Sequence, residues 1–196
     1  MEIEEIYGSL PELETKRLRL RKITAEDAEE IFYYASKEEV AKYVTWNTHR
    51  SLTDTKAFVS FVLDQYDQGK IAPWGIEIKQ NGSFIGTIDF VWWKPLHHSA
   101  EIGYVLSHDY WGKGIMAEAV GKLLSFGFEK MDLVRIQARC FVENIGSQRV
   151  MEKAGMSYEG LIRKGLFVKG KHRDLLMYSI IKEEFQALKE RNHRSI

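Results

Sequence analysis

The spacing of apolar residues divides the first third of the chain into a strand and two helices. Residues 18–23 alternate between apolar and basic, which predicts a strand. Apolar residues then recur every three or four positions over 25–35 and again over 52–66, which predicts two amphipathic helices. Each helix follows a capping sequence: Thr24-Ala25-Glu26-Asp27 and Ser51-Leu52-Thr53-Asp54.

The middle and end of the chain are predicted to be richer in strands. Asn81-Gly82 separates two β-patterned runs, 74–78 and 84–90, which indicates a hairpin. The same patterns continue to residue 181, and the expected elements are a strand at 100–106, a helix at 115–130, a strand at 134–140, a helix at 147–154 and strands at 158–164 and 174–181.

This order of elements predicts one domain of the α/β (α+β) class. We expect a mixed, mostly antiparallel sheet of about seven strands, flanked by about four helices. The stretch from Ala100 to Cys140 is the one expected parallel crossover. We expect residues 17–186 to form the domain, with an N-terminal extension at 1–16 and a basic C-terminal tail at 187–196.

Composition narrows the classes of partner. The chain of 196 residues carries 28 Lys and Arg against 28 Asp and Glu, so direct binding to nucleic acid is not expected. The N-terminus lacks an apolar signal core, and no apolar run is long enough for a membrane span. Cys140 is the one cysteine, which suits a reducing compartment, and we expect a cytoplasmic protein without membrane contact.

The junction between the strand ending at Leu106 and the helix starting at Ile115 carries the main chemical signal. Gly112 and Gly114 would let the backbone turn tightly, and the first turn of the helix would present free N–H groups. This combination suits an anion such as phosphate. The Gly-x-Gly pair alone fits an ordinary strand–helix turn equally well.

The downstream run supports the anion site. Asn144-Ile145-Gly146-Ser147, followed by Lys153-Ala154-Gly155-Met156, resembles the second signature of the GNAT superfamily of N-acetyltransferases, and Asp109-Tyr110-Trp111-Gly112-Lys113-Gly114 stands at the place of the first. The later Glu118-Ala119 and the earlier Ala100-Glu101-Ile102-Gly103-Tyr104 are similar to the branch that acetylates the N-termini of ribosomal proteins. Two positions depart from the family: Asp109 replaces Gln or Arg, and Met151 replaces a frequent tyrosine general acid.

The resemblance implies a site for acetyl-CoA, the acyl donor. The pantetheine arm is expected along the strand Tyr104-Val105-Leu106. Asn144 is expected to bond the coenzyme arm, to cap its helix, or to do both. Lys153 is a candidate phosphate contact, although a solvated helix lysine fits as well. The loop residues expected around the pyrophosphate are Gly112, Lys113, Gly114, Ile115, Met116 and Ala117.

Two residues are candidates for proton transfer. Glu101 shares a strand face with Ser99 and Gly103, whose small size would leave room beside its carboxylate, so it is a candidate general base or else an exposed strand glutamate. Glu159 is a second candidate base. Ser147 is a candidate proton donor to the departing thiolate, or else a first-turn serine bonded to the backbone.

The expected activity is acetyl transfer to a primary amine by direct attack on the thioester in a ternary complex. The resemblance favours the α-amino group of a protein, such as a ribosomal protein. Small amines such as polyamines or aminoglycosides are an alternative, and so is a non-catalytic sensor of acyl-CoA. Cys140 is expected in the core, no metal site is expected, and the protein is expected to be a monomer or homodimer.

Overall fold

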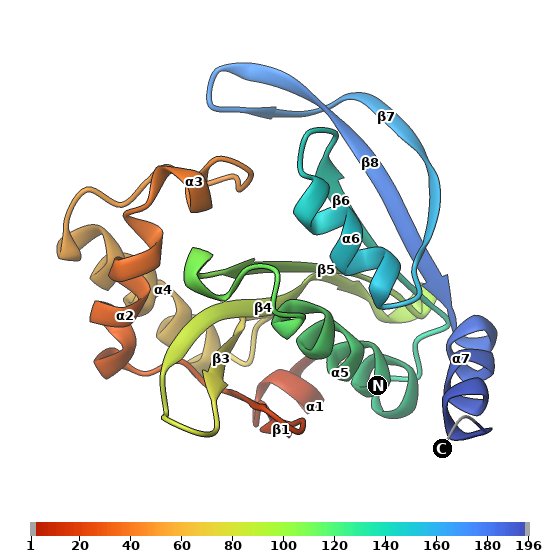
Figure 1. Ribbon diagram of the computed structural model, residues 1–196. Helices are drawn as coiled ribbons and strands as arrows, with labels where there is room; N and C mark the ends of the chain where they lie inside the picture. Colours follow the sequence, from red (N-terminus) through yellow and green to blue (C-terminus); the bar gives the residue numbers. More distant parts are fainter. Residues whose placement is uncertain (1–2, 195–196) are drawn as a thin grey trace.

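The computed structural model describes residues 3–194, which form one eight-stranded sheet with helices on both faces (Figure 1). The strands lie in the order β1-β2-β3-β4-β5-β6-β8-β7. Their bounds are β1 Leu13–Glu14, β2 Leu18–Arg21, β3 Trp74–Ile78, β4 Phe84–Lys94, β5 Ser99–Leu106, β6 Arg135–Phe141, β7 Ser157–Val168 and β8 Lys171–Ile181. The helices are α1 Ile3–Tyr7, α2 Ala28–Ala35, α3 Glu38–Ala41, α4 Leu52–Asp67, α5 Ile115–Lys130, α6 Ile145–Lys153 and α7 Lys182–Arg194.

The α/β (α+β) class and the mixed, mostly antiparallel sheet are confirmed. Of the strand pairs, only β5 and β6 run parallel, and α5 is the crossover between them, as predicted. The predicted cap of α4 is also present, because the Asp54 carboxylate accepts hydrogen bonds from the backbone N–H groups of Arg50 and Ser51. The described residues contain eight strands and seven α-helices, against the expected seven and four. Of the additional elements, α1, β1 and α3 are at most five residues long, too short to show a period, and α7 is the third additional helix, in the segment expected to be mostly a tail.

The segment before residue 17 packs onto the domain. β1 pairs with β2, and the side chains of Tyr7, Leu10 and Leu13 are buried in the main core. The indole N–H of Trp74 donates to the Pro11 carbonyl at 2.7 Å. Residues 3–14 therefore contribute to the core and the sheet; residues 1 and 2 of the expected extension lie outside the described residues.

The expected basic tail is largely helix. α7 continues to Arg194, and its Phe185 ring lies 5.1 Å from the ring of Phe128 on α5. Leu188 packs so closely against Gly155 that a Cβ there would lie 2.2 Å from it. Residues 195 and 196 of the tail lie outside the described residues.

The two faces of the sheet differ in character around β5 and β6. Ile136 and Phe90 approach Gly127 of α5, so these residues mark the apolar face. Residues that alternate with them, including Glu101, Gln137 and Arg139, point to the opposite face. We call these the α5 face and the polar face. This division decides which groups can reach each side of the site.

The β7–β8 hairpin reaches beyond the sheet. Figure 1 shows its far end at the top, extending toward α3. The Lys169 ammonium donates to the Ala41 carbonyl at 2.6 Å, and a second small cluster forms from Phe141, Val168 and Leu175, with Tyr43 packed against it. We call residues 160–174 the hairpin arm. Its contacts connect the last strands to the segment after α3.

The burial of Tyr7 leads to a stability prediction. Its side chain is 0% exposed and its ring lies 5.9 Å from that of Trp74, while its hydroxyl has no partner among the described residues. Tyr7→Ala is expected to lower the free energy of unfolding by about 3–5 kcal/mol, because it leaves a large cavity. Tyr7→Phe, the matched control, is expected to be neutral or stabilising, since it removes an unpaired buried hydroxyl. Denaturant unfolding measures both; equal stability of Tyr7→Ala and the wild type would contradict the packing of this segment.

Candidate active site

A cavity opens where β5 and β6 part. The two strands pair from Ser99 and Arg135 as far as Ile102 and Ala138, and no pairing follows. Beyond that point lies a cavity of about 580 Å³, lined by residues of β5, the loop before α5, the start of α5, β6 and α6, and by Tyr43 and Val44 after α3. Its size suits a small-molecule ligand.

The loop before α5 forms one wall of the cavity. Gly112 has φ 74° and Gly114 has φ 71°, a conformation that favours glycine. A Cβ at Gly112 would meet no atom within 4 Å, so the space beside this backbone is open. α5 begins at Ile115, and within the described residues no hydrogen bond uses the backbone N–H groups of Ile115, Met116 and Ala117. Free N–H groups at the positive end of a helix dipole can hold an anion.

Residues before and after this loop hold it in place. The Glu118 carboxylate accepts from the Thr15 hydroxyl at 2.6 Å and from the Arg17 backbone and side chain at 3.0 and 2.6 Å. Burial acts to raise the pKa of Glu118, but these hydrogen bonds outweigh it and hold the pKa below its usual range. Arg17 also donates to the Lys113 carbonyl at 3.1 Å. The loop is therefore tied to the first strands of the sheet.

Most residues predicted to bind the coenzyme meet at this cavity. The lining includes Tyr104, Val105, Leu106, Gly112, Gly114, Ile115, Met116, Ala117, Asn144 and Lys153. Lys113 is absent from it, and its ammonium lies 5.3 Å over the Tyr110 ring. Trp111, which stands in the first signature, also lines the cavity, and so does Arg149, which was not predicted as a ligand. Arg149 lies one helical turn from Ile145 on the exposed side of α6. Arginines are common on exposed helix faces, so its position in the sequence did not indicate a ligand contact.

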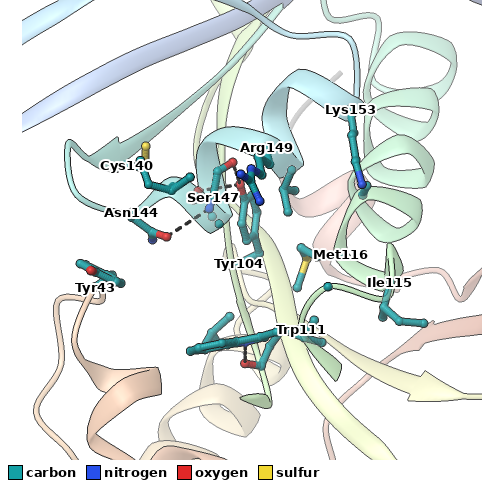
Figure 2. A pocket seen from close by; sticks show the side chains of 18 of the residues that line it. Tyr43, Tyr104, Trp111, Ile115, Met116, Cys140, Asn144, Ser147, Arg149 and Lys153 are labelled. Atoms are coloured by element: carbon teal, nitrogen blue, oxygen red, sulfur yellow. Dashed lines mark hydrogen bonds between the residues drawn. The ribbon is translucent and has the colours of Figure 1, made fainter. Parts of the chain in front are cut away.

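Two hydroxyls that meet belong to residues of the cavity wall. The Tyr104 phenol and the Ser147 hydroxyl lie 2.8 Å apart. Figure 2 shows the two side chains next to each other. Asn144 caps α6 by accepting from the Ser147 N–H at 3.1 Å, which matches one of its two expected roles. Burial raises the pKa of Tyr104 above its usual value, so the phenol keeps its proton. The sequence placed only the backbone of Tyr104 in the site, because the contact with α6 depends on the tertiary fold.

The expected bases, Glu101 and Glu159, are held by arginines on the polar face. Glu101 is 5% exposed and does not line the cavity; its carboxylate accepts from Gln137 at 2.8 Å and from two nitrogens of Arg139 at 2.9 and 2.7 Å. Glu159 accepts from Arg135 and Ser179, and these hydrogen bonds lower its pKa to about 2. The lowered pKa makes the Glu159 carboxylate a poor proton acceptor near neutral pH, and the Glu101 carboxylate is occupied by its contacts with Gln137 and Arg139.

Met151 and Cys140, which the sequence singled out, both have buried side chains. Met151, which replaces the frequent tyrosine, is 0% exposed and does not line the cavity. Cys140 lines the cavity but is 6% exposed, and burial raises the pKa of its thiol to about 11. This thiol is protonated at neutral pH and is a weak nucleophile.

The described residues contain no group of three or more His, Cys, Asp and Glu side chains suited to a metal ion. Within the same part of the chain, no helix has the length and apolar character needed to cross a membrane.

Comparison with known proteins agrees with this geometry. The acetyltransferase (GNAT) domain family matches residues 17–157. A relative named as an uncharacterized N-acetyltransferase, YoaA of Bacillus subtilis (strain 168), is 36% identical over 172 residues, covering 88% of this chain and 97% of the relative. A ribosomal-protein-serine acetyltransferase of Escherichia coli (strain K12) is 27% identical, covering 72% and 83%.

A solved structure shows the same fold. The crystal structure of a GNAT-family acetyltransferase from Bacillus anthracis superposes with a TM-score of 0.79 at 32% identity, covering 88% of this chain and 99% of the other. The family uses acetyl-CoA as acyl donor, in agreement with a cavity that offers free helix N–H groups to an anion. The chain therefore belongs to the GNAT acetyltransferase family and is an acetyl-CoA-dependent N-acetyltransferase.

Proposed function

We propose that this enzyme acetylates the N-terminal α-amino group of a protein or peptide, with neutral or acidic residues after the first. The amine attacks the thioester of acetyl-CoA directly while both substrates are bound. The observation that carries this proposal is the charge around the part of the cavity next to Tyr43 and Glu143, near the hairpin arm. We call this part the acceptor end.

The coenzyme occupies the α5 face of the opening. Its pyrophosphate accepts hydrogen bonds from the free N–H groups of Ile115, Met116 and Ala117, beside Gly112 and Gly114. Arg149 and Lys153 project from α6 toward the same region in Figure 2, where their charges suit phosphate. The pantetheine arm runs along the edge of β5 that β6 leaves unpaired.

The acceptor end is basic. The hairpin arm contains five basic residues, Arg163, Lys164, Lys169, Lys171 and Arg173, against the single acid Asp174. Among the described residues that line the cavity, Glu143 is the single acid, and Arg173 lies 3.9 Å from it. The arm reaches this end through the contacts of Lys169 with Ala41 and of Arg173 with the Phe141 ring.

This charge distribution disfavours polyamines and aminoglycosides. Such acceptors carry several positive charges, and their sites need carboxylates to offset the repulsion. A protein N-terminus brings one amine, and acidic residues behind it would be attracted by the hairpin arm. The Escherichia coli relative is named for acetylating a serine of a ribosomal protein, which agrees with an acceptor of this kind.

The chemistry needs no acyl-enzyme intermediate. Cys140 is the one thiol of the chain, and its raised pKa makes it unsuited to accept the acetyl group. Ser147 donates a proton to the departing thiolate and is reprotonated through its hydrogen bond with Tyr104. This hydroxyl pair supplies the proton that a tyrosine at Met151 would supply, which favours an active enzyme over a non-catalytic sensor. Glu101 positions Arg139, whose side chain lines the cavity.

Gly114→Glu is expected to weaken acetyl-CoA binding by more than about a hundredfold, or about 2.7 kcal/mol, because a carboxylate would stand beside the pyrophosphate. Gly82→Glu is the matched control: Gly82 has φ 73° and open space around it, but lies in the β3–β4 turn. Isothermal calorimetry should show wild-type affinity for the control. Equal affinity of both variants would contradict the pyrophosphate site.

Ser147→Ala is expected to lower kcat by about 10- to 100-fold with little change in acetyl-CoA affinity, because it removes the proton donor. Tyr104→Phe should lower kcat less, since Ser147 stays and loses only its partner. Ser60→Ala, an exposed serine on α4, serves as the control. Steady-state rates and calorimetry separate the two effects; an unchanged kcat in Ser147→Ala would exclude this serine as the donor.

The acceptor class is tested with a serine-initiated acidic peptide, its lysine-rich counterpart and spermidine. The acidic peptide is expected to have the highest kcat/KM, and added salt should reduce its advantage. Arg163→Glu combined with Lys171→Glu should raise its KM by about fivefold to tenfold, through lost attraction at the rim. Lys70→Glu, an exposed lysine three residues after the end of α4, is the control. Preference for spermidine would overturn the acceptor assignment, and acetyl-CoA binding without transfer to any amine would support the sensor.

A further inference from the structure

An acid stands alone in an otherwise apolar stretch of β4. Asp89 lies between Ile88 and Phe90, which are buried in the main core, and its own side chain points to the polar face and is half-buried. A carboxyl in such surroundings lowers stability unless it is paired or neutral. Its presence in this strand therefore calls for a reason other than packing.

Asp89 lies directly beside the cavity. Its partner across the β4–β5 ladder is Gly103, which lines the cavity one residue beyond Ile102, where β5 and β6 stop pairing. A Cβ added to Gly103 would lie 3.1 Å from the Asp89 carboxyl oxygen and 2.6 Å from Val91. The side chains of Val91 and Asp89 together occupy the room that the missing side chain of Gly103 leaves, so the Asp89 carboxyl stands at the point where the strands part.

This carboxyl is free to take part in proton transfer. Within residues 3–194, no hydrogen bond or ion pair to the Asp89 carboxyl occurs, whereas Glu101 and Glu159 are both held by arginines. Burial raises the pKa of Asp89 to about 7.

Few other titratable groups face Asp89. Tyr7 on α1 and Tyr66 on α4 are near enough to feel its charge, and burial raises the pKa of both phenols, so they stay neutral. Glu101, on the neighbouring strand, has its charge matched by Arg139. No cation near Asp89 holds its carboxyl in the ionised form, since burial is the one cause of its shifted pKa.

We propose that Asp89 is the general base that takes the proton from the acceptor's ammonium group, on the polar face of the parted strands. This inference rests on transfer to an amine, the reaction of the family, and does not require the acceptor to be a protein. The carboxyl lies on the face opposite α5 and α6, which hold the coenzyme in the proposed function. The amine therefore approaches the thioester from the side where Asp89 stands.

The proton balance closes with Asp89, the Tyr104–Ser147 pair and water. Asp89 as carboxylate takes one proton from R–NH3⁺ and later releases it to water. The neutral amine forms the new C–N bond, the C–S bond breaks, and the second amine proton passes to water as the amide forms. Ser147 delivers one proton to the thiolate and regains one from water through its hydrogen bond with Tyr104, so that one proton is released for each acetyl group transferred. An α-amino group, with its pKa of about 8, is well matched to a base near 7.

The first test is the pH dependence of kcat/KM in wild type, Asp89→Asn and Glu101→Gln, with a serine-initiated peptide and with spermidine as probe amines. The amine contributes its own limb, near pH 8 for the peptide and near pH 10 for spermidine. The wild type should show an additional limb near pH 7 that is the same for each amine that is acetylated. Asp89→Asn should lose this limb and about 100- to 1,000-fold in rate, while its acetyl-CoA affinity stays unchanged.

Glu101→Gln should keep the limb near pH 7, and Asp67→Asn, an exposed acid on α4, should behave as wild type. A limb near pH 7 that persists in Asp89→Asn would overturn the proposal. So would loss of that limb in Glu101→Gln alone.

A second test needs no acceptor. Carbon NMR of aspartate-labelled protein should show one carboxyl that titrates near pH 7 and is missing in Asp89→Asn. If every aspartate titrates below about pH 5, Asp89 is not the base, whichever amine is acetylated. The acceptor proposal fails separately: spermidine acetylated in preference to the peptide, with the limb near pH 7 intact, would support Asp89 and exclude the protein acceptor.

Discussion

The site depends on the point where β5 and β6 stop pairing. Four residues of each strand are joined as a parallel pair, and the strands then separate after Ile102 and Ala138. Unpaired backbone is costly when buried, so an opened edge needs another partner. A ligand with its own amide groups can be that partner, and in the proposed function it is the pantetheine arm of acetyl-CoA. The same opening gives access to the sheet from both faces.

The two faces of the opening serve different tasks because they carry different residues. On the α5 face lie the glycines and free helix N–H groups that hold the phosphate in the proposed function, and the Tyr104–Ser147 pair that supplies the proton there. On the polar face, the ion pair of Glu101 with Arg139 fixes one wall, and Asp89 stands beside Gly103. Coenzyme and amine can therefore reach the same carbonyl carbon without competing for the same surface.

The sequence predicted the features that depend on local pattern. Gly112 and Gly114 adopt a left-handed backbone that favours glycine, and Asn144 caps the start of α6. Both the glycine turn and the helix cap follow from residues that are neighbours in the sequence, so both could be predicted. The contacts of Glu101 and Asp89 could not be predicted in this way, because they depend on which residues face one another across neighbouring strands. A bulge between Phe90 and Trp92 shifts the ladder, and Gly103 then lies opposite Asp89. No one-dimensional pattern shows that the room left by Gly103 is filled from the neighbouring strand, or that Glu101 meets Arg139.

The zero net charge of the chain conceals a separation of charge that matters at the site. Acids and bases balance in number, but the hairpin arm is basic and Glu143 is the single acid among the described residues that line the cavity. The arm is held at the acceptor end by contacts of Lys169 with a carbonyl and of Arg173 with an aromatic ring, and Arg173 also lies 3.9 Å from Glu143. Within the described residues the other four cations of the arm have no ion pair, so their charge acts on the opening. In the proposed function, a chain of zero net charge selects its acceptor by this local field.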